Sequence, residues 1–250
     1  MMVIKAIIMA GGKGTRLRPL TCGIPKPMAP ILNKPTMEYT VELLKHHEIT
    51  DIAVTIAHLP TLITDYFASG EKWDVNLKYY EEDVPLGTGG SVKNAEDFVD
   101  GTFMVLSGDS LTDIDIKKAL NFHKNKQSKA TLILKKEAFP IEYGVVITND
   151  NGEIVRFLEK PSWGEVFSNT INTGMYILEP EVLDYFQSGQ NFDFSKDLFP
   201  KLLADNVPMY GYITEDYWCD VGALKAYTQT HFDILQTKVK VKINGFQIEK

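Results

Sequence analysis

Short apolar runs alternate with amphipathic helical segments along the first half of this 250-residue chain. Hydrophobic spacing predicts strands at 3–9, 52–57, 103–107 and 131–135, and helices at 36–48, 60–69, 90–98, 115–125 and 195–204. Such alternation favours βαβ units, in which parallel strands form a central sheet covered by helices. We therefore predict an α/β fold with a Rossmann-like, mainly parallel sheet flanked by helices.

From about residue 140 the pattern changes toward paired strands. Residues 143–147 and 154–157 flank a turn at 149–152, which is typical of a β-hairpin. Residues 172–177 predict a further strand. A mixed α/β half is therefore expected to follow the parallel half, where it can carry a second substrate.

A glycine-rich loop follows the first predicted strand. Gly11, Gly12 and Gly14 let the backbone turn tightly and bring its N–H groups close to an anion. The cations Arg16 and Lys26 follow closely in the sequence, and Lys26 stands between two prolines that favour a fixed loop. A strand, a glycine turn and fixed positive charge together indicate a polyphosphate site.

This loop differs from two common nucleotide motifs. The P-loop pattern Gly-x-x-x-x-Gly-Lys-Ser/Thr does not occur in the sequence. The dinucleotide fingerprint Gly-x-Gly-x-x-Gly fails because Leu17 stands where the third glycine is needed. What remains, from Gly11 to Met28, resembles the signature Gly-Gly-x-Gly-Thr-Arg-Leu-x-Pro-Leu-Thr, then Pro-Lys-Pro-Met, of the sugar-1-phosphate nucleotidyltransferases.

The resemblance covers residues 1 to about 235 and is strongest to bacterial mannose-1-phosphate guanylyltransferase-like proteins. It implies a nucleotidyltransferase fold and the transfer of a nucleotidyl group from an NTP to a sugar 1-phosphate, with release of pyrophosphate. Because both substrates are anionic, such chemistry needs backbone amides, cations and a divalent metal more than a strong base. Mg²⁺ is therefore the expected cofactor.

The resemblance also implies roles for the residues that carry it. Arg16 would hold the leaving β- and γ-phosphates, and Lys26 would offset charge at the α-phosphate. Asp109, at the end of a predicted strand, would bind magnesium together with Asp220. The loop that surrounds the triphosphate would consist of Gly11, Gly12, Gly14 and Thr15.

Two further motifs match the substrate loops of this family. Glu159 and Lys160 would contact the sugar hydroxyls and the sugar phosphate, and the rest of the sugar pocket would be Gly144, Asn172 and Thr173. The base would lie against Gly87, Thr88 and Gly89, in a pattern that resembles guanylyl-type and some uridylyl-type members.

An acidic residue just upstream bears on the choice of base. Glu82 can only accept hydrogen bonds, and guanine offers N1–H and N2–H₂ together, whereas uracil offers one N–H beside carbonyls. This favours GTP, although a solvated acidic pair with Glu81 at a strand end is the structural alternative. GTP with mannose 1-phosphate is the leading expectation. UTP with glucose 1-phosphate, a heptose 1-phosphate guanylyltransferase, and a regulatory subunit that binds without turnover are the alternatives.

Composition limits the partners. A net charge of −7 argues against general nucleic-acid binding, which usually shows a basic footprint. No apolar run approaches the ~18 residues needed to span a bilayer, so we predict no membrane partner. The two cysteines, Cys22 and Cys219, have no metal-binding spacing, and a reduced cytoplasmic compartment is expected.

The C-terminal residues show a separate pattern. Val239, Val241 and Ile243 alternate with lysines, which looks like the first rung of a left-handed β-helix, an appendage common in this family. One rung cannot bury its own face, so a longer C-terminal region is expected, with an edge strand on the main domain as the alternative. We predict a catalytic domain over 1–235 and this strand over 236–250. Apolar surface near 227–248 suggests a homo-oligomer.

One acidic pair is expected to be structural. Asp113 and Asp115 form an Asp-x-Asp, a motif that metal-dependent glycosyltransferases use to bind nucleotide sugars. Either aspartate can instead cap the helix that begins near Ile116, and we favour this interpretation.

Overall fold

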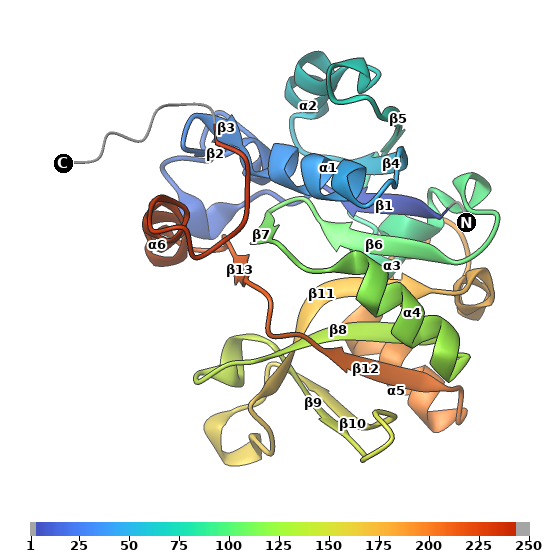
Figure 1. The fold of residues 1–250 in the computed structure, drawn as a ribbon. Coiled ribbons are helices and arrows are strands. Elements are labelled where there is room, and N and C mark those ends of the chain that lie inside the picture. The colour runs from blue at the N-terminus through green and yellow to red at the C-terminus, as the bar shows by residue number, and fades with distance from the viewer. Residues whose placement is uncertain (1–3, 244–250) are drawn as a thin grey trace.

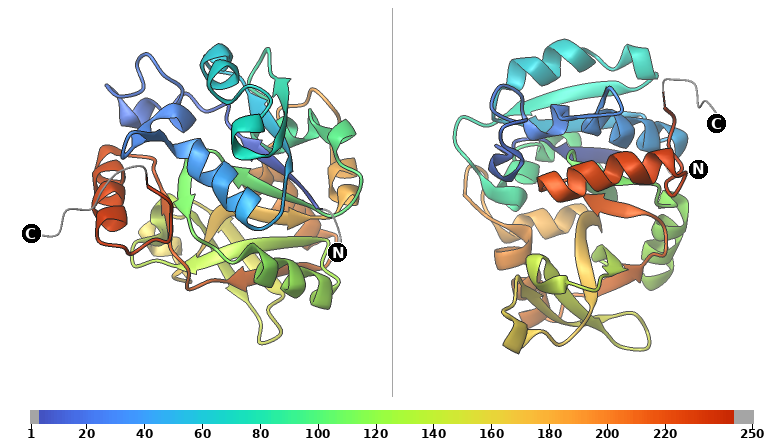
Figure 2. Two further views of the ribbon diagram at one scale, coloured as in Figure 1. Left: turned by 45° about the horizontal axis from the view of Figure 1, so that its top comes forward. Right: turned by 90° about the vertical axis from the view of Figure 1, so that its left-hand side faces the viewer.

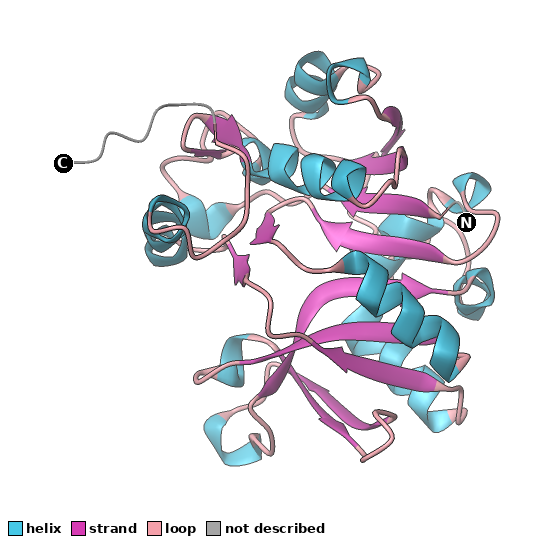
Figure 3. Cartoon of the chain, viewed as in Figure 1, coloured by secondary structure: helices cyan, strands magenta, loops and turns pink. Residues whose placement is uncertain are grey.

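One sheet runs through the whole molecule in this computed structural model, which describes residues 4–243 (Figure 1). Seven of its strands follow the order β10-β9-β11-β6-β1-β4-β5, with β8 beside β11 and β12 beside β8. Figure 3 shows helices on both sides of this sheet. The expected α/β architecture is thereby confirmed.

The first half of the chain builds the parallel part. Strand β1 (Lys5–Met9) lies between β4 (Asp51–Ile56) and β6 (Phe103–Ser107), and β5 (Asn76–Glu81) adds an edge. All of these pairs are parallel. Their carboxyl ends therefore meet at one edge of the sheet, where α/β proteins bind ligands.

Helices cover both faces. They are α1 (Thr36–His46), α2 (Pro60–Phe67), α3 (Gly87–Lys93), α4 (Ile116–Lys126), α5 (Phe199–Ala204) and α6 (Leu224–Leu235). The apolar sides of α1, α2 and α4 pack on one face, with Ile8 of β1, and those of α3 and α5 pack on the other, with Ile7. Neighbouring residues of β1 point to opposite faces, so its central apolar residues are buried on both sides of the sheet.

The second half is mixed. Its strands are β8 (Ala130–Lys136), β9 (Gly144–Thr148), β10 (Ile154–Glu159), β11 (Thr170–Leu178) and β12 (Met209–Ile213). Strand β11 pairs antiparallel with β6, β8 and β9 and so joins the two halves. The predicted hairpin is β9 and β10, and β12 lies parallel to β8.

Two small antiparallel sheets lie outside the main one. Strand β7 (Ser110–Thr112) pairs with β13 (Trp218–Asp220), and β2 (Pro30–Ile31) pairs with β3 (Lys34–Pro35). Sequence periodicity missed all four because strands of two or three residues are too short to show alternation. Strands β5 and β12 and helix α6 were also not predicted.

Two predicted helices are interrupted. The helix expected at 90–98 is α3, which ends at Lys93 and is followed by a separate 3-10 turn at Glu96–Phe98. The helix expected at 195–204 begins as a π-helical turn, Phe194–Leu198, before α5. Pro200 lacks the N–H that a continuous α-helix would use there.

The chain returns to its N-terminal third at the end. Figure 2 shows α6 beside the blue N-terminal segments, and Val239 packs with Ile31 and Ile234 in a small apolar cluster. Residues 236–243 contain no strand, and 244–250 lie outside the described residues, so the β-helix rung stays a prediction. Helix α6 leaves Phe232 and Leu235 exposed, and the oligomeric state also stays a prediction.

No helix in the described residues is both long and apolar enough to cross a bilayer.

Candidate functional site

A cavity of about 630 Å³ lies at the carboxyl ends of the parallel strands. Six predicted site residues line it: Gly11, Gly12, Glu82, Gly87, Thr88 and Asp109. Asp193, from the second half of the chain, lines it as well. The structure thus brings the glycine loop, the predicted base loop and the end of β6 to one cavity.

A second cavity, of about 650 Å³, lies at the other edge of the sheet. Ile4, Thr102 and Lys129, which precede β1, β6 and β8, are among its lining residues. It contains none of the predicted site residues. The convergence of charged and glycine-rich segments, rather than volume, identifies the first cavity as the candidate site.

The glycine loop wraps around the stem of Lys26. Gly14 has φ 61°, in the left-handed region, and a Cβ there would lie 2.8 Å from Lys26 Cβ. Only glycine fits both conditions without strain. The Gly14 carbonyl also accepts a hydrogen bond of 2.6 Å from Thr21 Oγ1, which fixes the turn. Thr15 begins the short 3-10 helix that follows.

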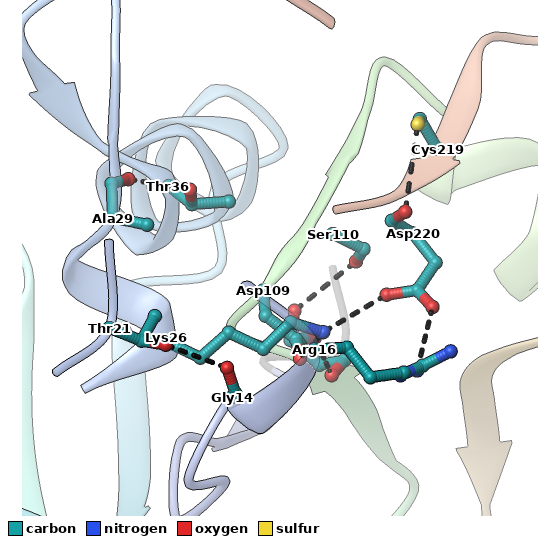
Figure 4. Close-up of polar contacts among 11 residues, drawn as sticks. Gly14, Arg16, Thr21, Lys26, Ala29, Thr36, Asp109, Ser110, Cys219 and Asp220 are labelled. Carbon is teal, nitrogen blue, oxygen red and sulfur yellow. Dashed lines mark hydrogen bonds and ion pairs between the residues drawn. The ribbon is translucent and has the colours of Figure 1, made fainter. Parts of the chain in front are cut away.

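Lys26 lies between two carboxylates (Figure 4). Its ammonium nitrogen is 2.5 Å from Asp109 Oδ2 and 3.2 Å from Asp220 Oδ1. The residue is only 8% exposed, so this contact is shielded from bulk water. One of the two carboxylates, Asp109, also lines the cavity, so this buried cation lies next to the space where a phosphate or a metal could bind.

The pairing of β7 with β13 brings the two carboxylates together. Asp109 occupies the turn between β6 and β7, and Asp220 pairs with Ser110 across the small sheet. The Val221 N–H also donates to the Asp109 carbonyl at 3.2 Å. Residues more than a hundred positions apart therefore meet through backbone pairing, which local sequence patterns do not encode.

The three charged groups of this cluster shift one another's pKa values. Burial alone would lower the pKa of Lys26, but the Asp109 and Asp220 carboxylates raise it overall, so Lys26 stays protonated. Burial raises the pKa of Asp220, Lys26 opposes this, and Asp109 adds to it. Asp109 is held from its other side by the Ser107 hydroxyl, which donates to Oδ1.

Arg16 reaches the same cluster from the glycine loop. Its guanidinium lies 3.9 Å from Asp220 Oδ2 and 3.8 Å from Glu142 Oε2. Both distances are too long for hydrogen bonds, and the side chain is 60% exposed. Arg16 is therefore only loosely held by these carboxylates, and its exposed guanidinium is free to bind an anion.

The donor set of this cluster fits Mg²⁺ in type but not in number. Asp109 and Asp220 offer hard oxygen ligands within 3.2 Å of one ammonium nitrogen. Residues 4–243 hold no group of three or more His, Cys, Asp or Glu side chains placed for a metal. Mg²⁺ commonly keeps waters and binds through one or two carboxylates plus substrate phosphates, so the pair suits a metal that arrives with a nucleotide.

The predicted base loop begins helix α3. Glu82 holds it through a hydrogen bond of 3.2 Å from the Leu86 N–H to Oε2. The other oxygen, Oε1, has no hydrogen bond among the described residues, and it borders the glycine loop, since a Cβ at Gly11 would lie 3.7 Å from it. One carboxylate oxygen thus positions the loop, and the other faces the cavity region as an acceptor.

Three of the five predicted sugar residues lie on the hairpin or directly after it. Gly144 of β9 pairs with Glu159 of β10, and a Cβ at Gly144 would lie 2.8 Å from Glu159 Oε2. A side chain there would displace this carboxylate. Lys160, with φ 45°, follows directly, and its exposed ammonium is 4.0 Å from Glu159 Oε1.

Asn172 and Thr173 lie in a bulge of β11 and are used internally. The Asn172 amide donates to Tyr176 Oη at 3.0 Å and to Ser195 Oγ at 3.3 Å. The Thr173 hydroxyl donates to the Ile133 carbonyl at 2.8 Å. Both residues are more than nine-tenths buried, so they shape the bulge, and direct contact of their side chains with a sugar stays a prediction.

In the ligand-free protein, Glu159→Gln is expected to raise the free energy of unfolding relative to the wild type, and this difference should grow as pH rises. Burial raises the pKa of Glu159, Lys160 opposes this shift, and Asp193 adds to it. Between the usual and the raised pKa, the folded carboxyl binds a proton that the unfolded chain has released. The free energy of unfolding of the wild type therefore falls as pH rises through this window, whereas glutamine does not titrate.

Thermal unfolding at about pH 5 and about pH 8 checks this expectation. Glu215→Gln, at an exposed position, shows the effect of the same substitution without burial. A Glu159→Gln advantage that stays constant or shrinks with rising pH would contradict the burial of this charge.

The Asp-x-Asp pair is structural, as predicted. Asp115 caps α4 by accepting a hydrogen bond of 3.1 Å from the Lys118 N–H. Asp113 accepts from the N–H groups of Tyr217 and Lys240, both at 2.8 Å. It therefore fastens the two C-terminal segments to the first half of the chain.

Two acidic residues of the site were not predicted. Glu142, beside Arg16, lies in a short 3-10 turn without a motif. Asp193 caps the turn before α5 and lines the cavity. Its place before the predicted helix at 195–204 is a typical N-cap signal, which would have located the residue but not its link to the base loop.

Comparison with known proteins agrees with this geometry. The model of the family described as Nucleotidyl transferase matches residues 5–237. A UTP–glucose-1-phosphate uridylyltransferase of Synechocystis sp. is 42% identical, over 98% of this chain and 67% of that protein. A mannose-1-phosphate guanyltransferase of Hypocrea jecorina is 36% identical, over 90% and 62%.

A solved structure supports the fold as well. HddC from Yersinia pseudotuberculosis, complexed with GMP-PN, superposes with a TM-score of 0.79 at 25% identity, over 92% of this chain and 99% of that one. The chain spans about two thirds of the length of the two curated relatives. The family that the glycine loop indicated is confirmed: the chain belongs to the nucleotidyl transferase family.

Proposed function

We propose that this chain transfers a nucleotidyl group from an NTP to a sugar 1-phosphate and releases pyrophosphate. The observation that carries the proposal is the buried Lys26 ammonium, held by Asp109 and Asp220 beside the glycine-lined cavity. In this reaction an oxygen of the sugar phosphate forms a bond to the α-phosphorus, and the bond from that phosphorus to the β-phosphate oxygen breaks. No strong base is needed, because the attacking phosphate is already an anion.

Different residues would bind different parts of the triphosphate. Backbone N–H groups at Gly11, Gly12 and Gly14 would surround the triphosphate. Lys26 would offset the charge that develops at the α-phosphate, and Arg16 would hold the departing pyrophosphate. Asp109 and Asp220 keep Lys26 protonated, so its positive charge is in place before substrate arrives.

Asp109 and Asp220 would hold Mg²⁺, with water and phosphate oxygens as its other ligands. When bound, the metal supplies further neutralisation of the phosphate charges.

GTP with mannose 1-phosphate is the substrate pair that we favour. The free acceptor oxygen of Glu82 supports guanine, which offers two adjacent donors. A mannose-1-phosphate guanyltransferase is among the relatives, and HddC was solved with GMP-PN.

UTP with glucose 1-phosphate is the second candidate. Its support is the 42% identity to a UTP–glucose-1-phosphate uridylyltransferase, which exceeds the 36% identity to the guanyltransferase. A heptose 1-phosphate acceptor and a non-catalytic regulatory role remain alternatives. The retained cluster of Arg16, Lys26, Asp109 and Asp220 argues against the regulatory role.

A matrix of substrates tests the proposal. Pyrophosphate release with Mg²⁺ is measured for GTP, UTP, dTTP, CTP and ATP against mannose, glucose, N-acetylglucosamine and heptose 1-phosphates. One dominant GTP and mannose 1-phosphate cell is expected. A dominant UTP and glucose 1-phosphate cell would replace the favoured pair, and a silent matrix with folded, nucleotide-binding protein would support the regulatory alternative.

Lys160→Ala is expected to raise KM for the sugar 1-phosphate about tenfold or more and to leave KM for the NTP nearly unchanged. The exposed ammonium directly follows the hairpin, beside Glu159, and loss of one charged hydrogen bond costs about 1.5–3 kcal/mol. Steady-state kinetics with each substrate varied in turn gives both constants. Lys124→Ala, on the exposed side of α4, is the matched control, and equal rises in both KM values would refute the assignment.

A further inference from the structure

The segment 190–196, here called the bridging segment, joins the two substrate regions. Its Phe192 carbonyl accepts hydrogen bonds from the N–H groups of Gly89 at 2.8 Å and Gly90 at 3.0 Å. In return, the Phe192 N–H donates to the Leu86 carbonyl at 2.8 Å. The predicted base loop is thus bonded to a segment that comes from the second half of the chain.

The glycine at position 87 is explained by this contact. Gly87 has φ 72°, and a Cβ there would lie 2.6 Å from the Phe192 carbonyl oxygen. A side chain would push the bridging segment away from the base loop. Glycine at this position therefore serves the approach of two protein segments, in addition to any approach of a nucleotide.

Asp193 is the side chain that contacts both sides of this junction. Its Oδ2 accepts a hydrogen bond of 3.0 Å from Thr88 Oγ1, and both residues line the candidate nucleotide cavity. Its Oδ1 accepts from the N–H groups of Ser195 at 2.9 Å and Lys196 at 3.1 Å. The Phe194 N–H closes the junction by donating to Thr88 Oγ1 at 2.9 Å.

The contact continues to the predicted sugar region. The Ser195 hydroxyl accepts a hydrogen bond of 3.3 Å from the Asn172 amide. Asn172 in turn accepts from the Gly174 N–H at 3.0 Å and so holds the bulge of β11. An unbroken series of hydrogen bonds therefore leads from Thr88, through Asp193 and Ser195, to the bulge.

We propose that Asp193 is a positioning residue that couples the binding of the two substrates. A nucleotide that fixes Thr88 also fixes the bridging segment, so the sugar region is ordered before the sugar phosphate arrives. The second ligand then loses less conformational entropy, and its affinity rises. Linkage requires that the sugar phosphate raise nucleotide affinity by the same factor. This inference rests on the proposed function.

Calorimetry on the whole chain measures the coupling directly. The dissociation constant of mannose 1-phosphate is determined with Mg²⁺, in the absence and presence of saturating α,β-methylene-GTP, which cannot react. If the substrate matrix selects UTP, the uridine analogue and glucose 1-phosphate replace them. The wild type is expected to bind the sugar phosphate at least about fivefold more tightly when the nucleotide is present.

The variants separate coupling from ordinary stability. Asp193→Ala and Thr88→Val should each reduce the coupling factor to below about twofold, and the double variant should lose no more than either single one. Asp184→Ala, an exposed aspartate replaced in the same way, should keep the wild-type factor. Asp193→Asn keeps an oxygen for the Ser195 and Lys196 N–H groups, so it should stay folded while losing part of the coupling.

Each other outcome has a defined meaning. An Asp193→Asn or Asp193→Ala protein that is folded and keeps the wild-type factor overturns the inference, as does an active wild type that binds both ligands without coupling. If the wild type binds neither ligand and has no turnover, the proposed function itself fails. If Asp193→Ala weakens each ligand alone but leaves their coupling intact, Asp193 is only structural.

Discussion

Lys26→Met is expected to lower kcat/KM by about 10³-fold, because it removes a buried cation fixed where charge develops in the transition state. The methionine side chain fills most of the same volume but leaves Asp109 and Asp220 without the ammonium that contacts both. Steady-state kinetics with the preferred substrate pair measures the loss. Lys124→Met, an exposed lysine replaced in the same way, should retain full activity.

The same substitution has a second signature, which does not depend on turnover. Two carboxylates that lose a shared cation repel each other. Removal of one partner of a buried ion pair lowers the free energy of unfolding by about 3–5 kcal/mol. The loss is smaller here because both carboxylates keep some contact with solvent. Added Mg²⁺ should therefore raise the melting temperature of Lys26→Met more than that of the wild type. A variant with wild-type activity, or one that Mg²⁺ does not stabilise, would contradict the assignment of Lys26 to the catalytic cluster.

Asp109→Asn is expected to lower Mg²⁺-dependent turnover by about 10³-fold while the protein stays folded. The amide keeps the size of the carboxylate and an oxygen that can accept from Lys26, but it loses the negative charge that would hold the metal. Metal-ion stabilisation of phosphate charge amounts to several kcal/mol, and each 1.36 kcal/mol corresponds to a tenfold change in rate.

Titration of activity with Mg²⁺ distinguishes metal loss from misfolding. The expected result is a much higher metal requirement or no activity at all, with a melting curve close to that of the wild type. Asp184→Asn, at an exposed position outside the site, is the matched control. Near-normal activity of Asp109→Asn at low Mg²⁺ would exclude Asp109 from the metal site.

The parts of the fold that the sequence predicted are those with strong local signals. Strand β6 is buried on both faces, so its apolar run is continuous, and the predicted range 103–107 matches Phe103–Ser107. Asp115 was expected as one of two candidate caps and fulfils that role for α4. In both cases the residues that determine the structure are neighbours in the chain.

The parts that escaped prediction depend on distant partners. Strand β13 has three residues and exists because it pairs with β7, which lies more than a hundred positions earlier. Asp220 could therefore be assigned to the site only through the family motif. The contact of Asp193 with Thr88 likewise requires the bridging segment to fold back on the base loop, and no local pattern encodes this.

The candidate site also combines features that the local sequence predicts with features that depend on distant residues. The glycine loop was evident from the sequence because three glycines and two cations stand close together. The close packing of Gly14 against the Lys26 side chain, however, is visible only in the structure, where a Cβ at position 14 would collide with that side chain. Asn172 and Thr173 were placed in the sugar pocket by motif, and the structure shows that their side chains bond within the protein.

The proposed reaction of this chain joins a nucleotide to a sugar phosphate. Phosphorus NMR of the protein with Mg²⁺, GTP and mannose 1-phosphate, and in parallel with UTP and glucose 1-phosphate, tests it most directly. Equal amounts of a nucleotide sugar and pyrophosphate are expected in at least one mixture, and both should form about 10³-fold more slowly with Lys26→Met. Release of pyrophosphate without a nucleotide sugar would contradict it, as would unchanged substrates with folded protein in these mixtures and in every other combination of the substrate matrix.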